Sequence, residues 1–235
     1  MDEGSVRIDR RFRGPPTSGN GGYCAGLLGA HLAGAVEVTL RAPPPLERDL
    51  RFTRTPTGAA LLDGDQVVAE ARAVPLALEV PAPPRLSDAR AWSLGYTGFA
   101  SHIFPGCFVC GPARGEGDGL RIFAGRSPEG TLVGAPFLPD ASLAGGVAGA
   151  PLPVPVAWAA LDCPGYFAVG NGEAALLGRM TAEWTRLPVT GARYVILGWP
   201  LGREGRKLHA GTALFDEAGA LLGRSRQTWL LTPAG

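Results

Sequence analysis

The second half of this chain repeats a pattern found in the first half. The clearest pair of matching segments is GAALLD at 58–63 and GTALFD at 211–216, identical at four of six positions and offset by 153 residues. An earlier stretch, 39–43, aligns with 184–188 at a smaller offset of 145, so the second copy carries insertions. Copies of roughly 110 residues are too long for a solenoid repeat. The sequence therefore predicts two similar domains fused in one chain.

The charge balance of the chain excludes two classes of partner. Its 235 residues include 22 basic and 21 acidic residues, for a net charge of +1. Nucleic acids and anionic membranes select a strongly positive surface, so we expect neither as a partner. The chain also begins without the basic and apolar regions of a signal peptide, and no apolar run reaches the about 18 residues of a spanning helix. We therefore expect a cytoplasmic protein.

Each half is predicted to contain one central helix followed by antiparallel strands. In the first half, Asn20 is a good N-cap for a Gly-rich helix that ends near residue 32. Asp63-Gly64 is a strong hairpin signal between two of the predicted strands. The strands are expected at 6–10, 35–41, around 50–52, 58–63 and 66–78 in the first half, and at 119–123, 131–137, 180–187, 193–199, 208–216 and 220–231 in the second.

The domain boundaries follow from a proline-rich stretch between the copies. We place the N-terminal half at residues 1–80, a linker at 81–106 and the C-terminal half at 107–235. Pro81, Pro83 and Pro84 prevent regular strand pairing in the linker. The aromatic residues of the linker predict that it packs on the two halves.

Asp162 is the first candidate catalytic residue, because it interrupts an apolar segment at 154–168. A carboxylate is costly to bury there unless it caps a helix, pairs with another group or takes part in chemistry. Pro164 suits a helix that begins near Asp162, which would make Asp162 its N-cap, and a longer kinked helix is the alternative. An ionised carboxylate can also act as a base or a nucleophile.

Gln227 is the second candidate, on the last predicted strand. By alternation it shares a face with Ser225 and Trp229, where its amide could hold a water or a carbonyl group. A surface position is the alternative. In the first half, Asn20 aligns with Asp162 and Ala73 aligns with Gln227, so this pair belongs to the second half alone.

Two further motifs have weaker implications. The helix start at Asn20-Gly21-Gly22-Tyr23 offers N–H groups that attract a polarised carbonyl or a phosphate, although a tight turn also explains the glycines. The stretch CFVC at 107–110 is a single C-x-x-C pair, whereas zinc needs four ligands. We expect Cys107 and Cys110 to form a structural turn and to bind no metal. A Gly-x-Ser-x-Gly hydrolase motif is missing.

These motifs, in this order, resemble a double hotdog protein of the acyl-CoA thioesterase II-like family. The resemblance rests on Ala160-Leu161-Asp162 in the helical segment and on LGRSRQ at 222–227 in the last strand. It implies an α+β fold, a tandem hotdog in which each antiparallel sheet wraps one central helix. The family carries a Thr or Ser on a strand between these motifs, where alignment on Trp184 places Gly178. The nearest hydroxyl is Thr181.

The resemblance also implies a function. The protein would hydrolyse an acyl-CoA or acyl-carrier thioester, with Asp162 as base or nucleophile and Gln227 positioning a water. Asn20, Gly21, Gly22, Tyr23 and Thr181 would bind the substrate, no cofactor would be needed, and a homodimer would be allowed. The alternative is a catalytically silent hotdog that binds an acyl thioester or a protein partner, which Gly178 favours. Dehydratase chemistry expects an Asp/His pair, and no His is visible near Asp162 in the sequence.

Two geometric expectations follow from this interpretation. If Asp162 and Gln227 form one site, their side chains should lie within reach of one bridging water, at most roughly 6–7 Å apart. A duplicated fold also offers two equivalent pockets. We expect hydrolysis only in the pocket around Asp162, because the amide of Asn20 cannot act as a base in the other.

Overall fold

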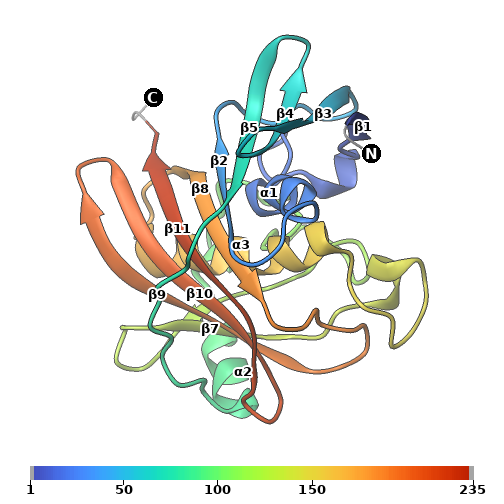
Figure 1. Ribbon diagram of the computed structural model, residues 1–235. Coiled ribbons are helices and arrows are strands. Elements are labelled where there is room, and N and C mark those ends of the chain that lie inside the picture. The colour runs from blue at the N-terminus through green and yellow to red at the C-terminus, as the bar shows by residue number, and fades with distance from the viewer. Residues whose placement is uncertain (1–2, 233–235) are drawn as a thin grey trace.

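The computed structural model describes residues 3–232 and contains one continuous antiparallel sheet (Figure 1). Its order is β1-β3-β4-β5-β2-β8-β11-β10-β9-β7-β6. The strands are β1 (Glu3–Arg7), β2 (Val36–Leu40), β3 (Asp49–Thr55), β4 (Gly58–Asp63), β5 (Gln66–Ala73), β6 (Gly125–Arg126), β7 (Val133–Phe137), β8 (Ala175–Trp184), β9 (Tyr194–Glu204), β10 (Lys207–Asp216) and β11 (Leu221–Leu231). The expected α+β class with an antiparallel sheet is confirmed.

The two halves meet at the β2–β8 pair. Val36 lies opposite Ala182 and Val38 lies opposite Met180, so the two sheets continue as one through this junction. Outward from it, the first half runs β2-β5-β4-β3-β1 and the second half runs β8-β11-β10-β9-β7. The strands therefore follow the same order on both sides of the junction.

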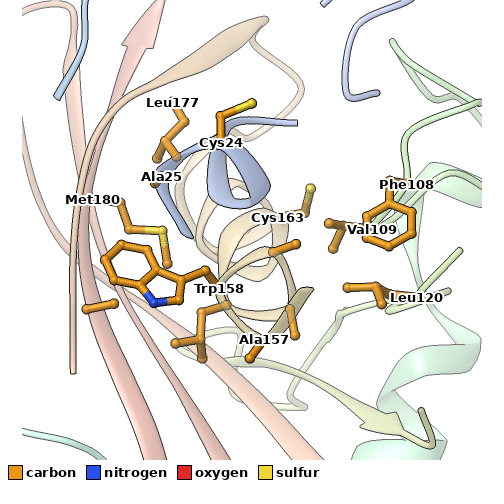
Figure 2. Packing of buried hydrophobic residues seen from close by; sticks show 14 of the residues in the cluster. Cys24, Ala25, Phe108, Val109, Leu120, Ala157, Trp158, Cys163, Leu177 and Met180 are labelled. Carbon is orange, nitrogen blue, oxygen red and sulfur yellow. The ribbon is translucent and has the colours of Figure 1, made fainter. Parts of the chain in front are cut away.

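Two helices lie on the same side of the sheet and pack against each other. They are α1 (Gly21–Gly29) and α3 (Val154–Val169). Their backbones approach closely, because a Cβ added to Gly26 would lie only 2.6 Å from the Pro155 Cα. In Figure 2, Cys24 and Ala25 of α1 lie beside the residues of α3 in the common core. The glycines of α1 thus allow contact with a second helix.

The structure adds one element and corrects two expectations. The segment expected to be a linker contains a helix, α2 (Leu86–Leu94), and Trp92 packs on Gly134 of β7. Residues 119–123 form no strand, because Arg121 adopts a φ of 53° that extended backbone excludes. Asp162 does not cap a helix, because α3 begins at Val154 and includes Pro164. The longer helix was therefore the correct alternative, although Pro164 costs it one backbone hydrogen bond.

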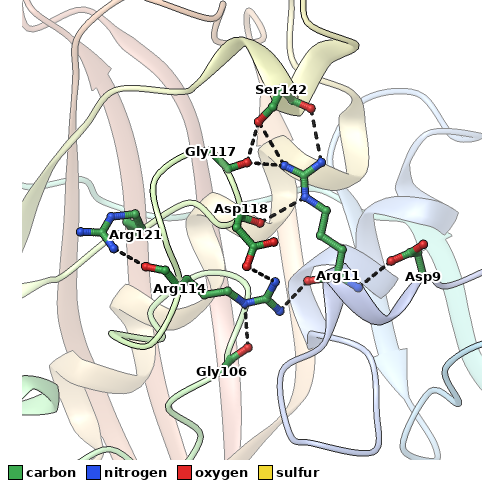
Figure 3. Close-up of polar contacts among 8 residues, drawn as sticks. All are labelled: Asp9, Arg11, Gly106, Arg114, Gly117, Asp118, Arg121 and Ser142. Atoms are coloured by element: carbon green, nitrogen blue, oxygen red, sulfur yellow. Dashed lines mark hydrogen bonds and ion pairs between the residues drawn. The ribbon is translucent and has the colours of Figure 1, made fainter.

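Three short 3₁₀ helices complete the described elements: η1 (Arg10–Phe12), η2 (Thr97–Phe99) and η3 (Ala141–Ala144). Two arginines tie η1 to the loop that follows the linker (Figure 3). The buried Arg114 donates to Arg11 O at 2.7 Å and to Gly106 O at 2.9 Å. Arg11 in turn donates to Gly117 O at 2.6 Å. These contacts fasten the loop of the second half to the first half.

Within residues 3–232, no helix is both long enough and apolar enough to cross a membrane.

Candidate functional site

A cavity of about 710 Å³ opens where the start of α1 meets α3 and β8. Its size falls in the range of small-molecule sites. The wall contains the polar side chains of Asn20 and Asp162 next to apolar groups such as Phe167, Leu177 and Trp229. Both halves of the chain contribute to it.

Asp162 is almost fully buried on this wall, at 1% exposure. Its Oδ2 accepts a hydrogen bond from Asn20 Nδ2 at 2.6 Å and another from the Gly22 N–H at 3.0 Å. Its Oδ1 is buried and has no hydrogen-bond partner among the described residues. One oxygen is therefore held in place, whereas the other is buried without a hydrogen-bond partner among the described residues.

The electrostatic environment of Asp162 favours its neutral form. Burial raises the pKa of its carboxyl group to about 7, and the charge of Cys107 acts in the same direction. The hydrogen bonds from Gly22 and Asn20 oppose this shift by stabilising the carboxylate.

Asn20 contributes to this site with both ends of its amide. Its Oδ1 accepts from the Tyr23 N–H at 2.9 Å, which confirms the predicted N-cap, while its Nδ2 donates to Asp162. The expectation that Asn20 and Asp162 line separate pockets is therefore wrong. The two aligned positions meet because α1 packs directly on α3.

The N–H groups at the start of α1 are partly used within the protein. Gly22 donates to Asp162, so its N–H is occupied. Gly21 lies on the cavity wall, and its N–H belongs to the first turn, where the helix itself supplies no acceptor. Gly21 is thus the better candidate to polarise a bound carbonyl group.

Gln227 is buried at 1% exposure, so the alternative of a surface position is wrong. Its Nε2 donates to Leu161 O at 2.5 Å and to Ser225 Oγ at 3.0 Å, and its Oε1 accepts from Trp229 Nε1 at 2.8 Å. Within the described residues, it makes no hydrogen bond to Asp162 and is not part of the cavity wall. Its link to the site is the carbonyl of Leu161, the residue before Asp162. A shared water between Gln227 and Asp162 remains a prediction.

Tyr23 and Thr181, which were also predicted to bind the substrate, are not part of the cavity wall. Tyr23 stacks on Phe12 with ring centroids 4.0 Å apart. Thr181 lies in the sheet, opposite Glu37 on one side and Arg226 on the other. Gly178, at the position expected to carry a hydroxyl, does line the cavity.

Sequence reasoning missed a cluster of thiols on the same wall. Cys163 of α3 joins Cys107 and Cys110, and the three Sγ atoms lie within 4.8 Å of one another. His102 Nε2 lies 3.3 Å from Cys110 Sγ. Hydrogen bonds from the Cys110 and Cys163 thiols lower the pKa of Cys107 well below its usual range. Cys107 and Cys163 are 56 positions apart in the sequence, and this separation forms no spacing pattern that would have indicated their contact.

Comparison with known proteins identifies the fold. No family model matches the chain, and no curated protein matches it. A hotdog-fold protein of unknown function from Alicyclobacillus acidocaldarius aligns with a TM-score of 0.64 at 13% identity, over 100% of this chain and 94% of its own. The TesB protein of Mycobacterium avium subsp. paratuberculosis aligns with a TM-score of 0.58 at 15% identity, over 92% and 88% of the two chains.

Two structures whose names state a chemistry are also similar. Acyl-CoA thioesterase II TesB2 of Mycobacterium marinum aligns with a TM-score of 0.53 at 11% identity, over 98% of this chain and 93% of its own. The PpsC dehydratase domain of Mycobacterium tuberculosis, solved in complex with C12:1-CoA, aligns with a TM-score of 0.55 at 15% identity. The alignment covers 98% of this chain and 93% of that domain. The chain is therefore a hotdog-fold protein, similar in structure to thioesterase II proteins.

Proposed function

We propose that this protein hydrolyses an acyl thioester carried by CoA or by an acyl-carrier protein. The observation that carries the proposal is the Asp162 carboxylate, which is buried on the wall of a largely apolar cavity and whose Oδ1 has no partner within residues 3–232. Buried carboxylates are costly unless they pair or react. The TesB neighbours add support, because they combine the same fold with thioester chemistry.

In this proposal, the two oxygens of Asp162 have different roles. Its Oδ2 stays fixed between Asn20 and Gly22, so the carboxylate cannot rotate away. Its Oδ1 takes a proton from a water, which attacks the thioester carbonyl carbon while the C–S bond breaks and the thiol leaves with a proton. Direct attack of Oδ1 on the carbonyl carbon is the alternative, with a covalent anhydride that water then hydrolyses. The Gly21 N–H supports the negative charge that develops on the carbonyl oxygen.

Gln227 acts as a positioning residue in this proposal. Its amide binds the carbonyl of Leu161 and the indole N–H of Trp229, which itself lies on the cavity wall. It therefore holds the backbone before Asp162 and one wall of the cavity at the same time. Tyr23 and Thr181 do not line the cavity, so in this proposal they affect substrate binding only indirectly, by supporting residues that do line it.

Dehydratase chemistry is the second candidate, because His102 lies on the same cavity wall as Asp162. The sequence did not indicate this proximity. Both ring nitrogens of His102 are engaged, however, since Nδ1 accepts from the Phe104 N–H at 2.9 Å and Nε2 contacts Cys110 Sγ. A free nitrogen for proton transfer to a substrate is thus missing, and we favour hydrolysis.

The test uses a panel of acyl-CoA substrates of increasing chain length. Hydrolysis of each substrate is measured as the release of free thiol. We expect turnover by the natural protein and none by Asp162→Asn. The dehydratase alternative is tested on the same samples with an enoyl-CoA. Its hydration is measured as the loss of the absorbance of the conjugated double bond. Binding of acyl-CoA without either reaction would contradict the proposal and support the silent binding module.

We also propose that the two halves are a tandem pair of hotdog units. The support is the strand order that both halves share and the repeated segments, which form β4 and β10 at corresponding places in that order. The boundaries 1–80, 81–106 and 107–235 belong to this proposal.

A further inference from the structure

Three cysteine sulfur atoms converge beside Asp162. Cys107 and Cys163 have their Sγ atoms 3.7 Å apart, and Cys110 completes a group in which every pair lies within 4.8 Å. Thiolates that bind one zinc ion at about 2.3 Å in a tetrahedron lie about 3.8 Å from each other. The Cys107–Cys163 pair already has this spacing, and the widest pair would need to close by about 1 Å at most.

The local backbone around Cys107 and Cys110 is built to present both sulfur atoms on one side. The Gly111 N–H donates to Cys107 O at 3.0 Å and closes a tight turn. A Cβ at position 111 would lie 2.5 Å from Cys107 N, so only glycine fits after the second cysteine.

His102 supports this cluster as a hydrogen-bond donor. Its Nδ1 accepts from the Phe104 N–H at 2.9 Å, so the ring proton of the neutral tautomer lies on Nε2. Nε2–H then points at Cys110 Sγ, 3.3 Å away. In this tautomer the ring donates to a ligand atom and does not bind a metal itself, which is the usual task of a group around a metal site.

We propose that Cys107, Cys110 and Cys163 bind one zinc ion as thiolates, with the fourth position taken by water or a solute from the cavity. Three soft sulfur ligands select zinc over hard cations such as magnesium and calcium. The site would tie the loop of residues 107–111 to the middle of α3, next to Asp162. The expectation of no metal rested on a lone C-x-x-C pair, and the third thiol removes that premise. The inference stands on the thiols alone and does not depend on hydrolysis.

The first experiment measures the metal content of the full-length protein. The natural chain is expected to contain about one zinc per chain by elemental analysis, and Cys163→Ser is expected to lose it. Cys24→Ser is the matched control, because Cys24 is also fully buried in the core but is not one of the three clustered thiols. Zinc retained in Cys163→Ser at the level of the control would overturn the proposal.

The second experiment covers the case in which Cys163→Ser does not fold. The natural protein is stripped with a chelator and titrated with Co²⁺. We expect thiolate-to-cobalt charge-transfer absorption and tetrahedral d–d bands that saturate at about one equivalent and disappear when Zn²⁺ is added. Cys24→Ser should give the same spectrum. Absence of these bands in the reduced, folded natural protein would overturn the proposal. So would an intact mass that shows a Cys107–Cys163 disulfide in place of the metal.

Discussion

At the scale of single residues, the site depends on the unequal surroundings of the two Asp162 oxygens. Oδ2 has two donors, whereas Oδ1 has none among the described residues. This arrangement separates the atom that keeps the side chain in place from the atom that can react. Two substitutions test the separation.

Asp162→Asn should remove activity and preserve the fold. The asparagine oxygen can still accept from Asn20 and Gly22, while its NH₂ group replaces the reactive Oδ1. Loss of a positioned base should reduce kcat by roughly two to four orders of magnitude. Steady-state thiol release and the melting temperature of the same preparation check this. A kcat within tenfold of the natural protein would show that Asp162 is not the acting group.

Asn20→Ala should reduce both stability and turnover. The lost N-cap costs about 1 kcal/mol, and the lost Nδ2 donor frees the Asp162 carboxylate to rotate. The effect on turnover is expected because of the hydrogen bond between Asn20 and Asp162. Asn20→Ser is the control, since serine restores a cap but is too short to replace the Nδ2 donor. We expect its melting temperature to recover and its kcat to stay low. Recovery of both would leave Asn20 with a structural role only.

At the scale of elements, close contact between α1 and α3 outweighs the low helix propensity of glycine. The start of α1 carries adjacent glycines, and Gly22 leaves only 2.6 Å between a hypothetical Cβ and the Cβ of Asp162. A larger residue there would push the two helices apart and remove the hydrogen bonds on Oδ2. The composition of α1 thus serves the geometry of the site.

The substitution Gly26→Ala tests whether helix propensity or helix–helix packing dominates at this position of α1. Alanine is favoured over glycine in a helix by about 1 kcal/mol, which would stabilise an isolated α1. In the protein, the new Cβ meets the backbone of Pro155 at 2.6 Å, which cannot move aside as a flexible side chain could. We expect a net loss of roughly 1–3 kcal/mol in unfolding free energy, as for other overpacked cores. Urea titration measures it, with Gly115→Ala as a control in open space. An increase in stability for Gly26→Ala would contradict the close packing.

At the scale of the whole molecule, the β2–β8 junction and the α1–α3 contact join the halves into one structure. The cavity takes its wall from both halves, so it exists only when both are folded. We therefore expect the chain to unfold in one cooperative transition.

The distribution of tryptophan makes this prediction easy to test. All five tryptophans lie from Trp92 onward, so none belongs to the first half. Tryptophan fluorescence reports on the second half and the linker, while far-UV circular dichroism reports on the whole chain. The two urea curves should coincide. A transition that is visible by circular dichroism and silent in fluorescence would show that the first half unfolds alone.

Local patterns in the sequence were sufficient for several features of the fold. The Asn20 cap, the β4 strand at Gly58–Asp63 and its turn into β5, and the buried face of β11 that carries Gln227 all agree with the structure. Each depends on a cap, a turn signal or an alternation of side chains. Such signals act over a few residues, so they can be recognised without knowledge of the rest of the chain.

Only the tertiary structure decided how the site is assembled. Asn20 and Asp162 are 142 residues apart, and Cys107 and Cys163 are 56 apart, yet both pairs are in contact. Asp162 lies in the middle of α3 because apolar burial along the whole segment outweighs the cost of Pro164 inside the helix. The sequence determined the types of group and the elements that carry them. Which groups meet was decided by the packing of α1 on α3, because contacts over such separations leave no periodic pattern in the chain.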